Sequence, residues 1–177
     1  MMEYDFLKIT KEIESENGFK KIAEKLFNSY AIKNYESIYR LTEIEFYWTS
    51  KSHVDNSTYK RKYVNPKQGD WFFHYSGVDI ALRNDEIEGH GGILIRGVCD
   101  INSKEKSISK RCFKGPMVCA MKLFSCTSAF NKSIETRIVK YDFPNEELKK
   151  TKRIGLGKNA TESGTENLKY RFIIDIS

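Results

Sequence analysis

The sequence lacks the features that mark membrane, secreted and zinc-binding chains. None of its apolar runs approaches the ~18 residues that cross a bilayer, and its first residues, MMEYDFLKITKE, have neither the basic start nor the apolar stretch of a targeting signal. Its 4 cysteines form no CxxC pair, which argues against zinc, and without a secretory signal reduced structural thiols are expected. A thiol nucleophile is the alternative. These absences predict a cytoplasmic protein that binds no metal and contacts no membrane.

The sequence also lacks linkers, internal repeats and low-complexity tracts. Its 3 prolines fall in expected turns, and a content of 40% hydrophobic and 13% aromatic residues is typical of a packed globular chain. A length of 177 residues suits one domain of ordinary size. We therefore expect one domain over residues 1–177, and a monomer.

The spacing of apolar residues divides the chain into a helical start and a long sheet region. Phe6, Ile9 and Ile13 keep helical spacing and FKKIAEKLFNSY predicts a second helix, so residues 1–30 are expected to be helical. Strands dominate residues 36–177, with IYRLTEIEFYW, GDWFFHY, VDIALRN, GGILIRGV and NLKYRFIIDIS as the strongest examples. The pattern predicts an α+β fold in which helices flank a sheet.

Three shorter features refine this pattern. Ser76-Gly77 predicts the turn of a hairpin between GDWFFHY and VDIALRN. Pro116 is expected in the first turn of a helix over GPMVCAMKLFSC. Cys112, Cys119 and Cys126 recur every seven residues, which would place them on one face if that whole segment were helical.

Positive charge is in moderate excess and is unevenly distributed. The net charge is +6, and basic residues gather in three clusters. Such clusters are either solvated surface or contacts for phosphate groups of a polyanion. They are Lys60 with Arg61 and Lys62, the segment 104–114 that contains Lys110 and Arg111, and the segment 149–153 that contains Lys152 and Arg153.

Charged residues inside apolar strands are the most informative feature. Glu43 and Glu45 lie two apart in TEIEFYW, so strand alternation predicts that they share one face, together with Leu41 and Tyr47. Arg96 lies in the apolar run ILIRGV. A lone buried charge costs several kcal/mol, so such groups are paired or functional. Either they form a structural pair between two strands, or a carboxylate and a guanidinium together hold a water or an anion in a cleft.

Aromatic residues gather in the same segments as these charges. Most are expected in the core, but a few that face a cleft beside a carboxylate would form a stacking slot for a planar base. Two carboxylates could also divide acid and base roles, as they do in glycoside-cleaving sites. The aromatic residues are Phe46, Tyr47, Trp48, Tyr59, Trp71, Phe72, Phe73, His74 and Tyr75.

Several motifs follow one another in an order that is characteristic of one enzyme family. The run EIEFY over 43–47 matches E-T-E-A-Y, and GDWFFH over 69–74, with Asn84 fifteen residues after its glycine, matches the hairpin G-x-L-Y-V-Y. ILIRG over 93–97 matches V-L-L-R-A, and RIGLG over 153–157 matches R-V/I-G-V/I-G. Weaker matches are DNSTY for D-x-x-x-H, Gly115-Pro116 for G-P-x-x-L, and KYRFI for W/L-R-F-Y.

Across roughly residues 20–175, the chain resembles the methylpurine (alkyladenine) DNA glycosylases. This family extrudes a damaged purine from DNA and hydrolyses its N-glycosidic bond, as in base excision repair. The resemblance implies a curved, mainly antiparallel sheet in an α+β domain, DNA as the partner, and neither a metal nor an organic cofactor.

The resemblance also implies roles for individual residues. Glu45 would be the general base that activates water, Arg96 and the carbonyl of Ile154 would help to orient that water, and Glu43 would be a structural acid. The resemblance further implies that Tyr47 stacks on one face of the base, with His74 and Tyr59 on the other. Asn84 would line the pocket and exclude purines with an exocyclic amino group. The expected contacts to the DNA backbone are Lys60, Arg61, Lys62, Lys110, Arg111, Lys152 and Arg153.

The chain departs from the family pattern at two positions. The family inserts a tyrosine from the hairpin tip into the gap left by the flipped nucleotide, and Gly77 aligns with it, although Tyr75 would serve if the hairpin is re-registered. Tyr59 stands where the family has histidine. Two alternatives therefore remain: hydrolysis of N-glycosidic bonds in single-stranded nucleic acid or free nucleotides, and a nucleic-acid-binding module without catalysis.

Overall fold

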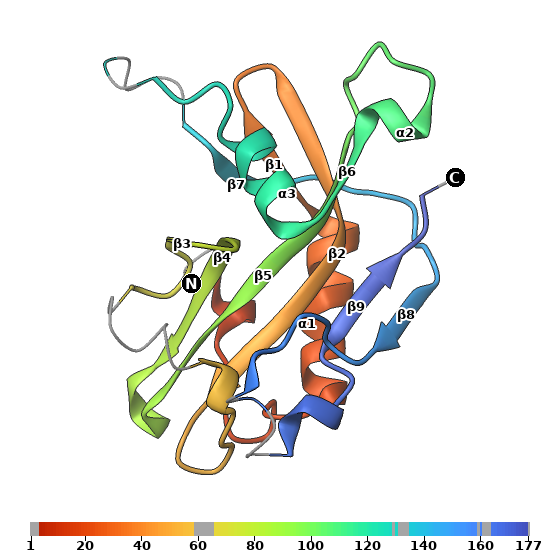
Figure 1. Ribbon diagram of the computed structural model, residues 1–177. Coiled ribbons are helices and arrows are strands. Elements are labelled where there is room, and N and C mark those ends of the chain that lie inside the picture. Colours follow the sequence, from red (N-terminus) through yellow and green to blue (C-terminus); the bar gives the residue numbers. More distant parts are fainter. Residues whose placement is uncertain are drawn as a thin grey trace.

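Figure 1 shows a computed structural model of the protein as a single α+β domain, in which a curled antiparallel sheet forms a half-barrel and helices are few. The structure describes residues 4–58, 66–128, 130, 135–158, 160 and 164–176. The central strands run in the order β3-β4-β5-β2-β1-β7, β6 extends β5, and β9 pairs with both β2 and β8. The strands are β1 (Tyr30–Asn34), β2 (Ser37–Thr49), β3 (Trp71–His74), β4 (Gly77–Asn84), β5 (Gly89–Asp100), β6 (Cys112–Lys114), β7 (Arg137–Lys140), β8 (Leu148–Thr151) and β9 (Arg171–Ile174).

The helices are short apart from α1, which packs against one face of the sheet. The predicted helix around FKKIAEKLFNSY is confirmed: Ser15 caps α1 by accepting a hydrogen bond from the Gly18 amide, and the apolar side of α1 is buried against β2 and β1. The helices are α1 (Glu16–Ser29), α2 (Ile108–Arg111) and α3 (Pro116–Leu123), with 3₁₀ turns η1 (Asp5–Leu7), η3 (Asp85–Ile87) and η5 (Thr165–Asn167).

The prediction of a helix over the first segment is wrong beyond η1. The backbone becomes extended at Lys8, so that Leu7 and Ile9, two residues apart, are both buried. The Ile9 carbonyl accepts a hydrogen bond from the Asn84 side chain. Tertiary packing of an extended segment therefore overrides the helical spacing of Phe6, Ile9 and Ile13.

Two irregularities in the pairing of β2 with β5 correct the predicted face of Leu41. Leu41 pairs with Val98, Glu43 with Gly97 and Ile44 with Ile95, so each strand carries one extra residue within this stretch. Such a bulge interrupts the two-residue alternation of side chains. Leu41 consequently joins the hydrophobic core with Ile44, whereas Glu43 and Glu45 are hydrogen-bonded to arginines outside it.

The hairpin β3–β4 is confirmed, but its turn lies one residue earlier than predicted. Tyr75 and Ser76 form the turn, and Gly77 is already the first residue of β4, paired with His74. A Cβ at Gly77 would lie 2.8 Å from the Pro116 Cβ, so only glycine fits where the first turn of α3 crosses the strand. Pro116 is the first residue of α3, as its position predicted.

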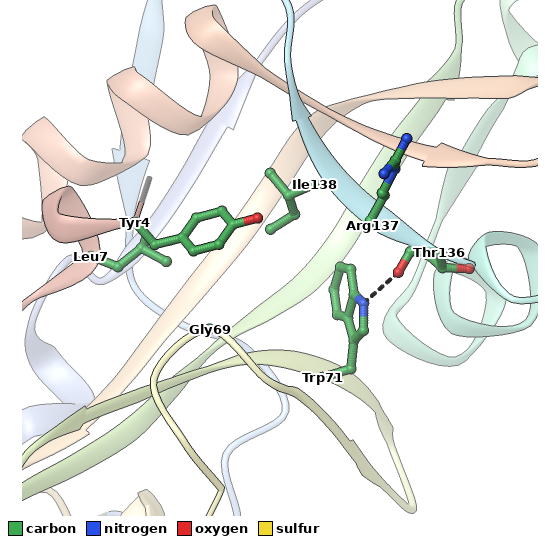
Figure 2. A pocket seen from close by; sticks show the side chains of 7 residues that line it. All are labelled: Tyr4, Leu7, Gly69, Trp71, Thr136, Arg137 and Ile138. Carbon is green, nitrogen blue, oxygen red and sulfur yellow. Dashed lines mark hydrogen bonds between the residues drawn. The ribbon is translucent and has the colours of Figure 1, made fainter. Parts of the chain in front are cut away.

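The outer strands β3 and β7 approach each other around a small cavity. The Trp71 indole donates a hydrogen bond to the Thr136 carbonyl at 2.8 Å and so joins β3 to the chain entering β7 (Figure 2). The cavity has a volume of about 110 Å³. Its lining residues are Tyr4, Leu7, Gly69, Trp71, Thr136, Arg137 and Ile138.

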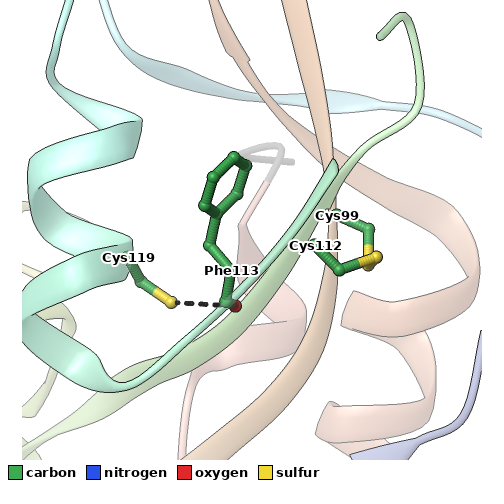
Figure 3. The surroundings of a disulfide bond; sticks show 4 residues. All are labelled: Cys99, Cys112, Phe113 and Cys119. Carbon is green, nitrogen blue, oxygen red and sulfur yellow. Dashed lines mark hydrogen bonds between the residues drawn. A yellow bond between two sulfur atoms is a disulfide. The ribbon is translucent and has the colours of Figure 1, made fainter. Parts of the chain in front are cut away.

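The cysteines are not all reduced, which corrects the expectation from composition. Cys99 in β5 and Cys112 in β6 are cross-strand partners joined by a disulfide (Figure 3). Cys119 is buried in α3 with its thiol against the Phe113 carbonyl, and Cys126 is exposed. The three cysteines spaced by seven therefore lie in a strand, a helix and a turn, and they share no helical face. In the described part of the chain, no helix is both long and apolar enough to cross a membrane.

Candidate functional site

Glu45 is a carboxylate sealed inside the protein. Its side chain has no exposed surface, and both oxygens accept hydrogen bonds. Oε1 accepts from the backbone amide of Ile154 at 3.0 Å, and Oε2 accepts from the Tyr47 hydroxyl at 2.9 Å. The Arg96 guanidinium lies 3.3 Å from Oε2. Three parts of the chain thus converge on one carboxylate: β2 supplies Glu45 and Tyr47, β5 supplies Arg96, and the segment after β8 supplies the Ile154 amide.

The surroundings of Glu45 raise its pKa. Burial disfavours the charged form and is the largest influence, and it outweighs the stabilisation of the carboxylate by Arg96, the Ile154 amide and Tyr47. A carboxylate with a raised pKa is, in its ionised form, a better proton acceptor than an ordinary glutamate. Such perturbed carboxylates gather at catalytic sites, although structural networks also contain them.

Glu43 lies in a different environment on the same strand. Its Oε1 accepts hydrogen bonds from Arg96 Nε at 2.9 Å and from Arg171 Nε at 2.8 Å, and its side chain is 12% exposed. Arg96 therefore bridges both glutamates, and Arg171 of β9 binds Glu43 from the other side. Glu43 thus forms a structural network with two arginines, and beside it Glu45 lies 3.3 Å from Arg96 and 4.0 Å from Arg171.

Sequence reasoning missed Asp79, a second carboxylate on the same face of the sheet. Asp79 and Glu45 are both cross-strand partners of Leu94, so the three side chains form one row across β4, β5 and β2. Asp79 is fully buried, and its Oδ1 lies 3.1 Å from His74 Nε2. The signal was present in the sequence, because an aspartate in the apolar run VDIALR is the same anomaly as a glutamate in TEIEFYW.

Tyr47 and His74 lie on opposite sides of the central strand β5. Tyr47 is on β2 and His74 on β3, and the sheet order places β4 and β5 between them. The Tyr47 hydroxyl is directed to Glu45, and the Arg153 guanidinium covers its ring at 4.7 Å from the centroid. The His74 ring is fixed at its edges by Asp79 and by the Ser76 hydroxyl. Their roles as stacking residues remain predictions, and Tyr59 lies outside the described residues.

Arg153 is a buried anchor, so its assignment to the DNA backbone is wrong. Its guanidinium has no exposed surface and forms an ion pair with Asp55 at 2.6 Å, with further hydrogen bonds to the carbonyls of Phe46 and Thr165. Burial by itself raises the pKa of Asp55, but the hydrogen bonds and charge of Arg153 outweigh it and lower the pKa. The pair fixes the chain just before Ile154, whose amide binds Glu45.

Asn84 does not line a pocket with Glu45. Strand alternation in β4 places Asn84 on the face of Ile80 and Leu82, opposite to Asp79. Its amide nitrogen donates to the Ile9 carbonyl at 2.8 Å, and its oxygen accepts from the Glu86 amide. Asn84 is therefore the cap of η3 and a tie to the N-terminal segment, and its assignment to the base pocket is corrected.

The remaining predicted contacts to DNA are only partly described. Lys110 and Lys152 are exposed, where they pair with Glu105 and Asn167, and Arg111 is half-buried in α2. Lys60, Arg61 and Lys62 lie outside the described residues. At the hairpin tip Tyr75 is 75% exposed, whereas Gly77 is buried.

The arrangement brings together a carboxylate base, arginine cations and the apolar side chain of Leu94. In the ranges that the structure describes, no group of three or more histidine, cysteine, aspartate or glutamate residues could hold a metal ion. Glu45 can accept a proton, Arg96 can stabilise or orient an anion or a water, and Leu94 separates Glu45 from Asp79. The cavity of Figure 2 is lined by other residues and is separate from this set.

Comparison with protein-family models finds no match, and comparison with curated proteins finds no significant relative.

Proposed function

We propose that the protein hydrolyses the N-glycosidic bond of a modified purine in DNA, as a divergent relative of the methylpurine DNA glycosylases. The observation that carries the proposal is Glu45. It is a fully buried carboxylate with a raised pKa, held by the Ile154 amide, Tyr47 and Arg96. A carboxylate held in this way is costly for the fold, and it is suited to taking a proton from water.

The reaction would proceed by carboxylate-activated attack of water. The bond between C1′ of the sugar and the base nitrogen breaks, and its electron pair leaves with the base. Positive charge develops on the sugar, and the negative charge of Glu45 stabilises it. The water oxygen bonds to C1′ as Glu45 accepts the proton of that water. A purine that is already cationic leaves as a neutral base and needs no further proton.

Arg96 is suited to a positioning role in this reaction. Its Nε binds Glu43 at 2.9 Å and its Nη1 reaches Glu45 Oε2 at 3.3 Å, so Glu43 fixes the guanidinium that orients Glu45. Glu45 lies directly beneath residue 154, whose side chain is 45% exposed. We infer that substrate reaches the carboxylate by displacing the chain from Ile154 onward, because Arg153 anchors the preceding residue and, among the described residues, only the backbone amide of Ile154 donates a hydrogen bond from this segment to Glu45.

The test is release of free base from alkylated DNA by the wild type and by Glu45→Gln. Glutamine keeps the size of the side chain but cannot accept the proton of water, so we expect a loss of at least ~10³-fold in the rate of release. DNA binding, measured in parallel by fluorescence anisotropy, should be unchanged. Glu24→Gln, at a half-exposed position on α1, is the matched control and should release base like the wild type.

The stability of Glu45→Gln separates lost chemistry from lost folding. Because the folded-state pKa of Glu45 is raised, its contribution to stability is present below the unfolded-state pKa and is lost as pH rises through the folded-state pKa. Wherever Glu45 is ionised in the folded protein it therefore costs stability, and the neutral glutamine should not lower the melting temperature. Undiminished base release by a folded Glu45→Gln protein would contradict the mechanism. A wild type that binds DNA but releases no base would favour the binding module.

A further inference from the structure

The disulfide between Cys99 and Cys112 closes a loop that lies outside the Glu45 site. The two cysteines form the last pair of the β5–β6 ladder (Figure 3), and residues 100–111, here called the basic loop, leave the sheet beyond them. The basic loop contains α2 and projects away from the sheet at this end of β5 (Figure 1). The disulfide therefore holds together the two ends of a projecting loop.

The projecting part of the basic loop is exposed and carries an excess of positive charge. Residues 103–111 contain four basic side chains and one acidic side chain. Lys104, Lys106 and Lys110 are exposed, and the ion pair of Lys110 with Glu105 lies at the surface, where such pairs contribute little. Within the described residues, neither Lys104 nor Lys106 has a carboxylate or another hydrogen-bond partner. The loop thus offers unneutralised ammonium groups to an anion.

The composition of the loop favours the phosphate backbone of a nucleic acid as that anion. Lysine side chains bind phosphates and release the counterions that surround them, and serine hydroxyls also contact phosphate oxygens. The loop has three serines among its basic residues, at 103, 107 and 109. An anionic membrane fits less well, because surface binding to a bilayer needs a broad apolar face. Ile108, 43% exposed, is the one large apolar residue in 102–111.

The loop has little besides the disulfide to hold its shape. Within the described residues, the hydrogen bonds of residues 103–111 join them to one another, as when the Ser107 carbonyl accepts from the amides of Lys110 and Arg111. The nearest tie to the rest of the chain is at the base, where Asn102 donates to the Glu36 carbonyl. Without the disulfide the end of the ladder can open and the loop gains conformations. Ordering these conformations again on binding lowers the affinity.

We propose that the disulfide makes DNA binding by the basic loop depend on redox state, so that the oxidised protein binds DNA more tightly than the reduced protein. Formation of the disulfide takes two electrons and two protons from the thiols of Cys99 and Cys112. A small disulfide such as oxidised glutathione accepts them and becomes two thiols. The proposal shares DNA as a ligand with the proposed function. It concerns binding and not base release, so the two can fail separately.

The experiment measures the affinity of the oxidised and reduced protein for one undamaged DNA duplex by fluorescence anisotropy. The protein is oxidised with glutathione disulfide or reduced with dithiothreitol, and circular dichroism checks that both forms are folded. We expect reduction to weaken binding by about 5-fold, because the loop must then be ordered on binding. Cys99→Ser/Cys112→Ser should bind like the reduced wild type and should not respond to dithiothreitol. Equal affinities of the two wild-type forms would overturn the proposal.

Substitutions in the loop keep the disulfide and test the contact itself. Lys104→Gln/Lys106→Gln should lose two phosphate contacts, so that log K against log salt becomes less steep by about 1.8. Its affinity should also respond less to reduction than that of the wild type. Lys11→Gln/Lys21→Gln removes two exposed lysines outside the loop and is the matched control.

The remaining outcomes separate this proposal from its alternatives. A salt dependence of Lys104→Gln/Lys106→Gln equal to that of the control would overturn the basic loop as the DNA contact. Binding to phosphatidylserine vesicles without binding to DNA would overturn the choice of a nucleic acid. Redox-dependent DNA binding by a protein that releases no base from alkylated DNA would overturn the proposed function alone.

Discussion

Glu43 and Glu45 are two residues apart on β2, yet their surroundings separate their roles. Glu43 is 12% exposed and accepts one hydrogen bond from each of two arginines. Glu45 has no exposed surface, one arginine within hydrogen-bond distance, and a pKa raised by burial. A carboxylate balanced by two cations stabilises the fold, whereas one that burial makes more basic is available for proton transfer.

The first prediction at this scale concerns Glu43→Gln. The substitution removes the charge that lies between Arg96 of β5 and Arg171 of β9, and leaves two guanidiniums facing each other. We expect the free energy of unfolding to fall by about 3 kcal/mol, the lower end of the cost of breaking a buried ion pair, because the site is slightly exposed. Urea denaturation followed by circular dichroism measures the change.

Lys8→Gln provides the control for this prediction, since it breaks an exposed pair with Glu86 and should change stability by less than ~0.5 kcal/mol. If Glu43→Gln changed the free energy of unfolding by no more than Lys8→Gln does, the stabilising role assigned to Glu43 between the two arginines would be contradicted.

The sequence context of single residues predicted part of this site, and there are identifiable reasons why it did not predict the rest. Charges in apolar strands indicated Glu43, Glu45 and Arg96, and the structure brings the three together. Arg153 was misassigned because its partner, Asp55, lies 98 residues earlier, and no local pattern links the two. Asp79 was overlooked although the same rule applies to it.

At the scale of elements, the hairpin β3–β4 bears most directly on whether the substrate is duplex or single-stranded DNA. Its two-residue turn places Tyr75 at the tip with 75% of its surface exposed, and buries Gly77 against α3. An exposed aromatic ring at a hairpin tip is suited to filling the gap that a flipped nucleotide leaves in a duplex. The geometry therefore favours Tyr75 over Gly77 for this role.

We predict that Tyr75→Ala lowers base release from duplex DNA by about 10- to 100-fold, and that it lowers release from single strands much less. A single strand has no stacked gap to fill, and unstacking a base in a duplex costs a few kcal/mol. Parallel single-turnover assays on the same lesion in both forms measure the difference. Tyr75→Phe keeps the ring and should behave like the wild type. Equal losses on both forms would contradict insertion.

The disulfide between β5 and β6 supports the same strand that carries Arg96. Cys99 and Cys112 are 13 residues apart, and closing a loop of this size stabilises a protein by about 3 kcal/mol in the chain-entropy model. The double variant Cys99→Ser/Cys112→Ser should lose about this much in urea denaturation. Dithiothreitol should destabilise the wild type by a similar amount and leave the double variant unchanged. A wild type insensitive to the reductant would contradict the prediction.

Elements were easier to predict than the pairing between them. Alternation indicated β2, the β3–β4 hairpin, β5 and β9, because each is a long or strongly apolar run. The bulge between Leu41 and Ile44 was not predictable, since it depends on the register with Val98 and Ile95 of β5. The disulfide was missed for the same reason: Cys99 and Cys112 meet only once β6 pairs with β5.

At the scale of the whole molecule, the curled sheet assembles the site from distant parts of the chain. Glu45 of β2, Arg96 of β5 and Arg171 of β9 are neighbours because β2 pairs with both β5 and β9. The segment after β8 returns over β2 and closes the site with the Ile154 amide. Composition and motif order indicated one α+β domain, but the strand order that places these residues together follows from non-local pairing.

The pH dependence of base release from alkylated DNA tests the central claim most directly. Glu45 must be ionised to accept the proton of water, and burial raises its pKa. We predict that the single-turnover rate, corrected for depurination without protein, rises with pH through a midpoint above the ~4.3 of an ordinary glutamate and then stays level, and that Glu45→Gln lacks this rise. A midpoint at or below that of an ordinary glutamate, or the same profile in Glu45→Gln, would contradict the assignment of Glu45 as the general base.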